Sequence, residues 1–285
     1  MSEEKRYLLV FEQIQPIHIG AGSYGVVNET RIFIPGWTMW GALTNAYCRM
    51  MGEHPKENEN QGLFKKITCF YPSFHPSAGK DNENVLLPAF KGGEFHLGQF
   101  SEDRFRAMFV DTFVSTAINP AHRSTKDESL HEINIVLPKA KSGYSVNSKE
   151  QRLYWIGAVE TGADIPDGMK IVVGGDVRYG FGEMILKEKK ETAKKYFDKW
   201  LFEGADEVIL RNYLAVGKLQ NAKLVEGKTE VVVELEESRK DANLRVTEPE
   251  MCFAPGSKIK IDKNEQGSIL VEKGILTKKE ASKAT

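Results

Sequence analysis

The sequence predicts an α+β protein. Short runs rich in β-branched and aromatic residues, such as 7–11 and 230–235, alternate with segments whose apolar residues recur at helical spacing, such as 37–50. Of the 285 residues, 41% are hydrophobic and 28% are charged, which is typical of a globular chain that buries a core. No internal repeat at a fixed period is visible, and the length permits one large domain or two small ones.

The N-terminal segment predicts a long strand over 7–19, half buried toward its end. The glycine-rich run 20–25 then predicts a flexible loop, and a short strand is expected over 31–34. Pro35 and Gly36 precede a predicted helix that begins near Trp37 and ends at Gly52.

The middle of the chain alternates between loops and short elements. Residues 53–100 are rich in Asn, Pro, Gly and Lys and predict mainly exposed loops. Ser101, followed by two acidic residues, predicts the cap of a helix. Further strands are expected at 133–137, 154–159 and 169–173.

The last hundred residues combine one lysine-rich segment with several β-branched runs. Residues 187–201 predict a helix whose lysines surround an apolar stripe. Such lysines indicate a solvated face, and a track for phosphates is the alternative. The remaining expectations are a strand at 230–235, a charged loop at 236–250, a strand or hairpin at 251–261 paired with 268–271, and a frayed tail from Leu276 onward.

Net charge and cysteine content limit the classes of function that the chain can have. The formal net charge of −1 argues against coating of nucleic acid by the whole surface, but it permits a local basic groove. Cys48, Cys69 and Cys252 are odd in number and widely spaced, so they form neither a disulfide framework nor a zinc motif. We therefore expect no metal, no cofactor and a cytoplasmic setting. No apolar run approaches membrane-spanning length, so no membrane partner is expected.

Residues 174–183 read Gly-Gly-Asp-Val-Arg-Tyr-Gly-Phe-Gly-Glu and follow a predicted strand. Glycines let backbone amides approach a ligand, and Arg178 suits a phosphate. Tyr179 and Phe181 supply flat rings on which unstacked bases can rest. The alternative is a hairpin with close backbone packing.

Two histidines stand in a polar stretch that contains two cations. His122 and His131 flank Arg123 and Lys126, and this combination of groups can cleave RNA without metal through acid–base catalysis. The alternative is that both are ordinary loop histidines. His18 ends the first predicted strand, where it can bond to a nucleotide or simply close the strand.

Four segments in this order resemble the RAMP superfamily of CRISPR-associated proteins. They are His18-Ile19-Gly20 with the following glycine-rich loop, Ile34-Pro35-Gly36 leading to Gly41-Ala42-Leu43, the polar segment that ends at Ile133, and Gly174 to Gly182. The match covers roughly residues 7–186, and the second segment is similar to type III effector subunits in particular.

The resemblance implies a ferredoxin-like (RRM-like) core over 1–186, with an insertion at about 53–150. Residues 187–285 would then form a C-terminal helix plus a β-rich extension, or a degenerate second domain. The core would contact guide RNA through its first helix and the glycine-rich loop, and the segment around Arg123 would form a thumb-like hairpin against the guide–target duplex. The RNA-binding residues expected on this basis are His18, Gly20, Gly22, Arg31, Gly36, Trp37, Thr38, Arg123, Lys126, Gly175, Arg178, Tyr179, Gly180, Phe181 and Gly182.

Two departures from the family pattern qualify the expected activity. Trp37-Thr38-Met39-Trp40 stands where the family often has a basic residue after Pro-Gly. The loop 26–30 lacks the aspartate with which backbone subunits cut target RNA, and Glu29 is the nearest substitute. We therefore expect no catalysis.

The expected function is a non-catalytic RNA-binding subunit of a type III CRISPR ribonucleoprotein. Its expected partners are guide RNA, neighbouring RAMP subunits and target RNA, and the long second half favours the 5′-tag end of the complex. The alternatives are a metal-independent RAMP endoribonuclease that uses His18, His122 or His131, a target-cleaving backbone subunit, and an α+β protein without a nucleic-acid role.

Overall fold

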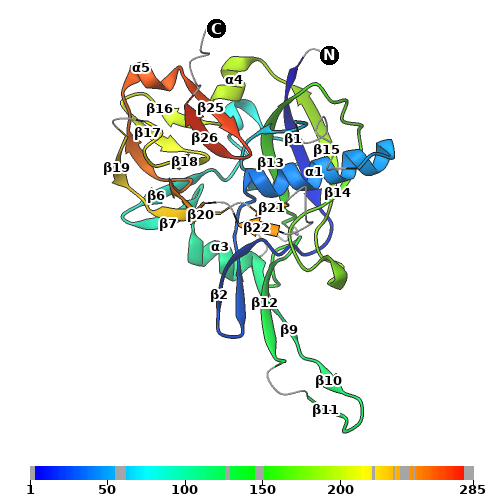
Figure 1. The fold of residues 1–285 in the computed structure, drawn as a ribbon. Coiled ribbons are helices and arrows are strands. Elements are labelled where there is room, and N and C mark those ends of the chain that lie inside the picture. The colour runs from blue at the N-terminus through cyan, green and yellow to red at the C-terminus, as the bar shows by residue number, and fades with distance from the viewer. Residues whose placement is uncertain are drawn as a thin grey trace.

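The computed structural model describes residues 4–54, 62–125, 129–144, 151–219, 222–233, 235–237, 244–246 and 248–278. The fold is α+β, as predicted, with most described elements being strands. A central sheet crossed by one long helix, a sheet that projects from it, and a β-rich C-terminal part make up the molecule (Figure 1).

An antiparallel six-stranded sheet forms the centre of the molecule. In spatial order its strands are β14 (Lys170–Val172), β15 (Glu183–Glu191), β1 (Lys5–Gln13), β13 (Tyr154–Thr161) and β4 (Lys66–Ile67), and β5 (Tyr71–Ser73) also pairs with β13. Leu9 on β1 lies opposite Gly157 on β13, and both residues are buried. A Cβ at Gly157 would overlap the Phe70 ring, so this glycine lets Phe70 pack directly on the sheet.

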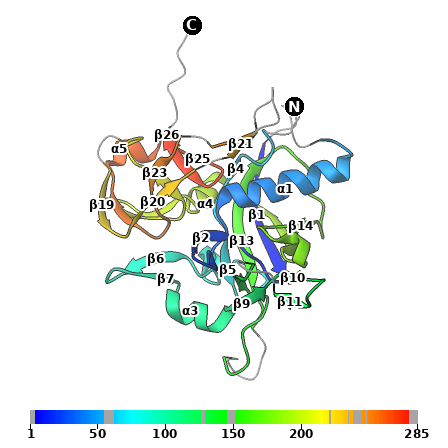
Figure 2. The same cartoon turned by 60° about the horizontal axis from the view of Figure 1, so that its bottom comes forward.

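Helix α1 (Gly36–Met51) packs against β14 and β4 and confirms the predicted first helix. Its buried face carries Met39 and Leu43. It ends at Gly52, whose φ of 69° is the left-handed conformation that glycine adopts without strain. Figure 2 shows α1 extending along the sheet, with β25 (Ile269–Glu272) beside one end.

A second sheet projects away from the central one. Its strands, in spatial order, are β2 (Gly20–Tyr24), β3 (Val27–Thr30), β12 (His131–Val136) and β9 (Val110–Ser115), and β10 (Ile118–Asn119) pairs with β11 (Ser124–Thr125) at the far tip (Figure 1). The glycine-rich run 20–25 is therefore one side of a hairpin and not the flexible loop that the composition predicted. The strand expected at 31–34 is also wrong: β3 ends at Thr30, and Ile34 makes only an isolated bridge to Phe70.

Residues 53–100 contain more structure than expected, although residues 55–61 lie outside the described part of the chain. Besides β4 and β5, the segment holds the 3-10 helix η1 (Lys80–Asn82), β6 (Pro88–Lys91), β7 (Glu94–Leu97) and the start of β8 (Phe100–Ser101). Helix α3 (Glu102–Phe109) follows and begins where it was predicted, because the Ser101 hydroxyl accepts from the Arg104 amide at 3.3 Å.

Two further sheets and one hairpin form the C-terminal part. The first sheet has the order β16 (Phe202–Gly204), β17 (Glu207–Leu210), β24 (Lys258–Lys260) and β19 (Lys223–Glu226). The second has the order β20 (Thr229–Val232), β23 (Glu250–Phe253), β18 (Tyr213–Ala215), β26 (Ile275–Lys278) and β25. The hairpin pairs β21 (Leu235–Glu237) with β22 (Leu244–Val246), and two short helices are α4 (Lys194–Asp198) and α5 (Lys263–Gln266).

Several expectations for this part are wrong. Residues 187–191 continue β15, which pairs with β1, and only the short α4 follows. The strands β23 and β24 lie in different sheets and do not form a hairpin, and β25 pairs with β26 instead. Leu276 is fully buried in β26, so the tail does not fray there. The segment 236–250 was expected to be a charged loop, but it contains the end of β21 and all of β22.

The C-terminal part shares one core with the central sheet. The buried Asn212 accepts a hydrogen bond from the Cys69 amide at 2.7 Å and donates one to the Trp200 carbonyl at 2.7 Å. The Tyr71 hydroxyl donates to the carbonyl oxygen of Arg211 at 2.6 Å. These bonds satisfy buried polar groups across the junction and hold the two parts in one arrangement.

Candidate nucleic-acid interface

A cavity of about 610 Å³ lies where the start of β2, the start of α1 and the glycine-rich bend after β14 come together. Residues 231–233, which belong to the end of β20 and the residue after it, also line the cavity. Five of the residues that the sequence predicted as RNA contacts line this cavity: Gly20, Arg31, Trp37, Thr38 and Gly175. The structure therefore places the start of α1 and the bend at one site.

The bend is built by close backbone packing against residues 16–18, which connect β1 to β2. Gly174 has a φ of 86°, and a Cβ there would overlap the carbonyl oxygen of His18. The amide of Gly175 donates to that same oxygen at 2.9 Å, and the amide of Gly182 donates to the Pro16 carbonyl at 2.9 Å. The expectation that the bend presents a row of bare amides is therefore wrong at Gly175 and Gly182.

Some side chains of the bend pack against other residues, and others are exposed to solvent. Phe181 is only 7% exposed and packs with Ile133 and Phe113, so the expectation that it offers a face to a base is wrong. Tyr179 is half-buried beside Phe113, at 5.1 Å between ring centroids. Arg178 is exposed on the 3-10 helix η2 (Val177–Tyr179), with its guanidinium 5.6 Å from the Tyr179 ring.

Gly180 ends η2 with a φ of 84° and donates from its amide to the carbonyl of Val177 at 3.0 Å. In the described part of the chain, no neighbouring atom lies within 4 Å of the position of a Cβ at Gly180, so the backbone conformation, and not crowding, favours glycine. Asp176, at the other end of η2, is also left-handed, with a φ of 56°. The two left-handed residues present Arg178 at the apex of the bend.

His131 links the bend to the projecting sheet. The Tyr179 hydroxyl lies 3.3 Å from His131 Nε2, and Nδ1 of the same ring lies 3.1 Å from the Ser129 carbonyl oxygen. A carbonyl oxygen only accepts, so the neutral ring carries its proton on Nδ1 and accepts from the hydroxyl at Nε2. His18 is buried, with Nδ1 2.8 Å from the Asn134 carbonyl oxygen.

The start of α1 packs against the C-terminal part. A Cβ at Gly36 would overlap the backbone of Gly274, and the Gly36 amide points toward the thiol of Cys69. Burial raises the pKa of that thiol to about 12, so Cys69 is a neutral thiol. The amide of Thr38 donates to the Pro35 carbonyl at 3.1 Å. Gly36 and the amides of Gly36 and Thr38 are therefore used in contacts within the protein. The half-buried Thr38 residue, in contrast, lines the cavity.

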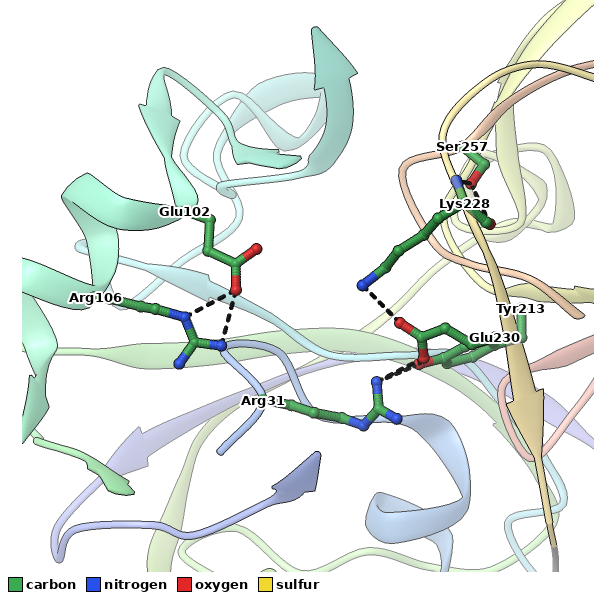
Figure 3. Close-up of polar contacts among 7 residues, drawn as sticks. All are labelled: Arg31, Glu102, Arg106, Tyr213, Lys228, Glu230 and Ser257. Atoms are coloured by element: carbon green, nitrogen blue, oxygen red, sulfur yellow. Dashed lines mark hydrogen bonds and ion pairs between the residues drawn. The ribbon is translucent and has the colours of Figure 1, made fainter. Parts of the chain in front are cut away.

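Arg31 carries a charge that the protein itself neutralises. Its guanidinium donates to the Glu230 carboxylate and to the Tyr213 hydroxyl, both at 2.8 Å, and Lys228 lies 2.9 Å from the same carboxylate (Figure 3). Burial by itself would raise the pKa of Glu230, but Arg31 and Lys228 lower it below its ordinary value. The Tyr213 ring also packs against Trp37, at 5.0 Å between centroids.

Two further predicted residues, Gly22 and Arg123, lie on the projecting sheet and at its tip and not at the cavity. Gly22 is exposed on β2, and Arg123 is exposed in the β10–β11 turn with a φ of 51°. Lys126 lies outside the described residues. The hairpin tip is far from α1 (Figure 1), which agrees with the expected thumb-like projection. Glu29 is half-buried on β3, and its neighbour Asn28 accepts from the Ser23 hydroxyl at 2.7 Å.

Sequence reasoning missed part of the cavity. Gly41 and Asn45 line it from the exposed side of α1. Gly41 stands in the Gly-Ala-Leu motif but was not predicted as a contact, and both residues are spaced from Thr38 so that they share one side of the helix. Val172 and Val231 line it from β14 and β20. No local pattern indicates that a strand near residue 231 docks beside the first helix.

The described residues contain no group of three His, Cys, Asp or Glu side chains that could hold a metal ion. Within the same residues, no helix is long and apolar enough to cross a membrane.

The fold is similar to chains of two solved type III complexes. One is from the cryo-EM structure of the Type III-B Cmr-beta complex bound to cognate target RNA; it is 13% identical, with a TM-score of 0.58, and the match covers 97% of this chain and 100% of that chain. The other is from the same kind of complex bound to cognate target RNA and AMPPnP, state 1; it is 12% identical, with a TM-score of 0.56 and coverage of 89% and 86%. Neither a family model nor a curated protein matches the sequence. At these identities the likeness concerns the fold.

Proposed function

We propose that this chain is a non-catalytic RNA-binding subunit of a type III CRISPR effector ribonucleoprotein. The observation that carries the proposal is the convergence of segments near residues 20, 36 and 175 on one cavity. These are the segments on which the resemblance to RAMP proteins depends. The similar solved chains come from type III-B complexes bound to target RNA, which supports the same assignment.

The topology of the central sheet supports a RAMP core of the ferredoxin-like kind. In that fold a first strand, a helix and a second strand form a split βαβ unit, with a third strand inserted between the two. Here β1, α1 and β4 follow this path, and β13 lies between β1 and β4. The second helix of the fold is missing between β13 and β14, where residues 162–169 form no helix.

In this proposal the exposed Arg178 contacts a backbone phosphate beside the cavity. Arginine presents several N–H donors that suit phosphate oxygens. The projecting sheet contacts neighbouring subunits or the guide–target duplex, because β10 and β11 lie at its far tip (Figure 1). The C-terminal part, which supplies one cavity wall, favours the 5′-tag end of the complex.

The absence of catalysis is part of the proposal. His18 is buried with Nδ1 engaged, and His122 is exposed in a turn. The 26–30 segment offers Glu29 and Asn28 on a paired strand in place of an aspartate.

The test is expression of the full chain with its neighbouring subunits, followed by sequencing of the copurified RNA. We expect guide-length RNA with a common 5′ end and no cleavage of that RNA or of its complement. Copurification of the other subunits and RNA without this chain bound to them would contradict the proposal.

A metal-independent endoribonuclease is the second candidate, and the His131–Tyr179 pair favours it. The 3.3 Å contact sets an imidazole beside a phenol near the exposed Arg178. An imidazole and a phenol can act as an acid–base pair, and the guanidinium supplies a cation. This candidate predicts cleavage of repeat RNA in the presence of EDTA, with loss of cleavage in His131→Ala and not in His122→Ala.

A further inference from the structure

The described wall of the cavity offers no unpaired charge for a phosphate. Among its described lining residues, Arg31 carries the charge, and Glu230 neutralises it at 2.8 Å. Lys228 binds the other side of the same carboxylate and not the cavity wall. A phosphate that entered would lose hydration without gaining an unpaired counter-charge, and this transfer is unfavourable. The occupant that fits is therefore an uncharged group.

The cavity also contains space that the fold itself does not require. Gly41 lies in the interior of α1, and a Cβ at this position would contact no atom of the described residues within 4 Å. Neither a positive φ nor close packing explains this glycine, and glycine in a helix interior is less stable than alanine. Gly36, on the same helix, contrasts with it because Gly274 leaves no room for a side chain there. Gly41 therefore keeps an open wall for a group that the chain does not supply.

The walls combine apolar surface with unused polar groups. Val172 and Val231 line the cavity and are 48% and 55% exposed, which is high for valine. Thr38 and Asn45, on the same side of α1 as Gly41, make no side-chain hydrogen bond within the described part of the chain. A flat uncharged ring with polar edges fits both kinds of wall, since its faces pack on valine and its edges bond to a hydroxyl and an amide.

We propose that the cavity receives one nucleobase of the bound RNA. This inference rests on the proposed function and adds which part of the RNA enters the cavity. The base lies over the backbone at Gly41, between the Thr38 and Asn45 side chains and the valines of β20. Its phosphate stays outside the cavity, on the side of Arg178, which follows Gly175 by three residues. The ion pair with Glu230 fixes Arg31 in the wall of the cavity, so Arg31 does not act as a phosphate ligand.

The test fills the cavity without disturbing the fold. Gly41→Ala adds a methyl group and Gly41→Leu adds a larger side chain, and the Cβ of either meets no atom of the described residues within 4 Å. Met50→Leu, on an exposed position of the same helix outside the cavity, is the matched control. The probes are fluorescent oligo(A), oligo(C) and oligo(U) of about 12 nucleotides, together with an abasic ribose–phosphate oligomer of the same length. Dissociation constants are measured by anisotropy over a range of salt concentrations.

We expect the unmodified chain to bind at least one homopolymer about ten-fold more tightly than the abasic oligomer. Gly41→Leu removes this difference, Gly41→Ala reduces it, and Met50→Leu leaves it unchanged. Affinity for the abasic oligomer and the slope of affinity against salt stay the same in all three variants, because no phosphate contact is lost. The melting temperature of Gly41→Ala does not fall, so the loss of binding is not a loss of folding.

Three results would overturn the inference. Equal affinity of the unmodified chain for homopolymers and abasic oligomer would show that no base is held. Unchanged homopolymer binding in Gly41→Leu, with loss of co-elution with a neighbouring subunit, would assign the cavity to a protein side chain. No binding of any oligomer would remove the proposed function itself, whereas the first two results leave RNA binding intact.

Discussion

The guanidinium of Arg31 donates to the carboxylate of Glu230 at 2.8 Å, and the two residues are 199 positions apart in the chain. Each side chain is 18% exposed, so the pair is largely shielded from solvent. It joins the segment before α1 to strand β20 (Figure 3). Arg31 and Val231, the residue after Glu230, line the cavity. The same ion pair therefore links the two parts of the chain and supports the wall of the candidate site.

Removing the charge of Glu230 should destabilise the fold. Glu230→Gln keeps the shape of the side chain but leaves Arg31 without its anion, and we expect a loss of about 1–3 kcal/mol in the free energy of unfolding. Urea denaturation at pH 7 measures this loss. The control is Glu191→Gln, which breaks an exposed pair with Lys5 and should cost less than about 1 kcal/mol. Equal effects of both substitutions would contradict the role assigned to Glu230.

The same pair predicts a dependence on pH. Arg31 and Lys228 outweigh burial and lower the pKa of Glu230 in the folded chain. A lowered pKa means that the stabilisation is complete above the ordinary pKa of about 4.3 and is lost as the pH falls through the lower, folded value. The stability difference between the unmodified chain and Glu230→Gln should therefore be constant from pH 8 to about pH 5 and shrink below it. A difference that grows on acidification would refute this assignment.

Two glycines of α1 should respond in opposite ways to alanine. Gly36→Ala places a methyl group on the backbone of Gly274, and we expect a loss of about 1–3 kcal/mol from overpacking. Gly41→Ala places the methyl group in open space and should stabilise the chain by about 0.5–1 kcal/mol. Thermal melts of the two variants compare them directly. A stabilised Gly36→Ala would mean that the start of α1 does not dock on the β25–β26 turn.

Phe181 should matter for packing and not for base stacking. Phe181→Leu removes ring contacts with Ile133 and Phe113, and we expect a loss of about 1–2 kcal/mol in stability. RNA affinity at a temperature where the variant is folded should change by less than about three-fold, whereas loss of a stacked base costs about 1–3 kcal/mol. A larger loss of affinity without loss of stability would restore Phe181 as a base contact.

Arg178 should contribute one phosphate contact. Arg178→Ala is expected to weaken binding of all RNA sequences alike and to reduce the slope of log affinity against log salt by about one. The control is Lys258→Ala, which removes a cation that is paired with Glu207 on the C-terminal part. Equal slopes for Arg178→Ala and the unmodified chain would exclude a phosphate contact at the apex of the bend.

The elements that the sequence predicted well carry local signals. Helix α1 has apolar residues at helical spacing, Pro35 before it and Gly52 after it. The segment 187–201 shows the opposite case: its lysines and apolar residues favoured a helix, but pairing with β1 extends β15 to Glu191. There Lys187 forms an ion pair with Glu12, and Lys189 forms one with Asp164; both carboxylates are distant in the sequence. Tertiary pairing overrides local preference in such a segment.

Part of the candidate site could likewise be predicted from the sequence, and part of it could not. The order of the motifs indicated that the start of α1 and the bend belong together, and the structure places both at one cavity. The neutralisation of Arg31 by Glu230 and the wall formed by Val231 could not be predicted, because each depends on contacts between distant parts of the chain. The burial of Phe181 was also hidden, since its neighbours lie on the projecting sheet.

The β25–β26 turn has a consequence for synthesis on the ribosome. Gly274 lies against Gly36, and its amide donates to the Ile67 carbonyl at 2.8 Å, so the packing of the beginning of α1 is complete only when β26 is in place. At roughly 5–20 residues per second, most of the chain emerges before that strand exists. The nascent N-terminal part would thus expose the surface that β26 and its neighbours later cover, and a chaperone or an early-binding partner would find it there.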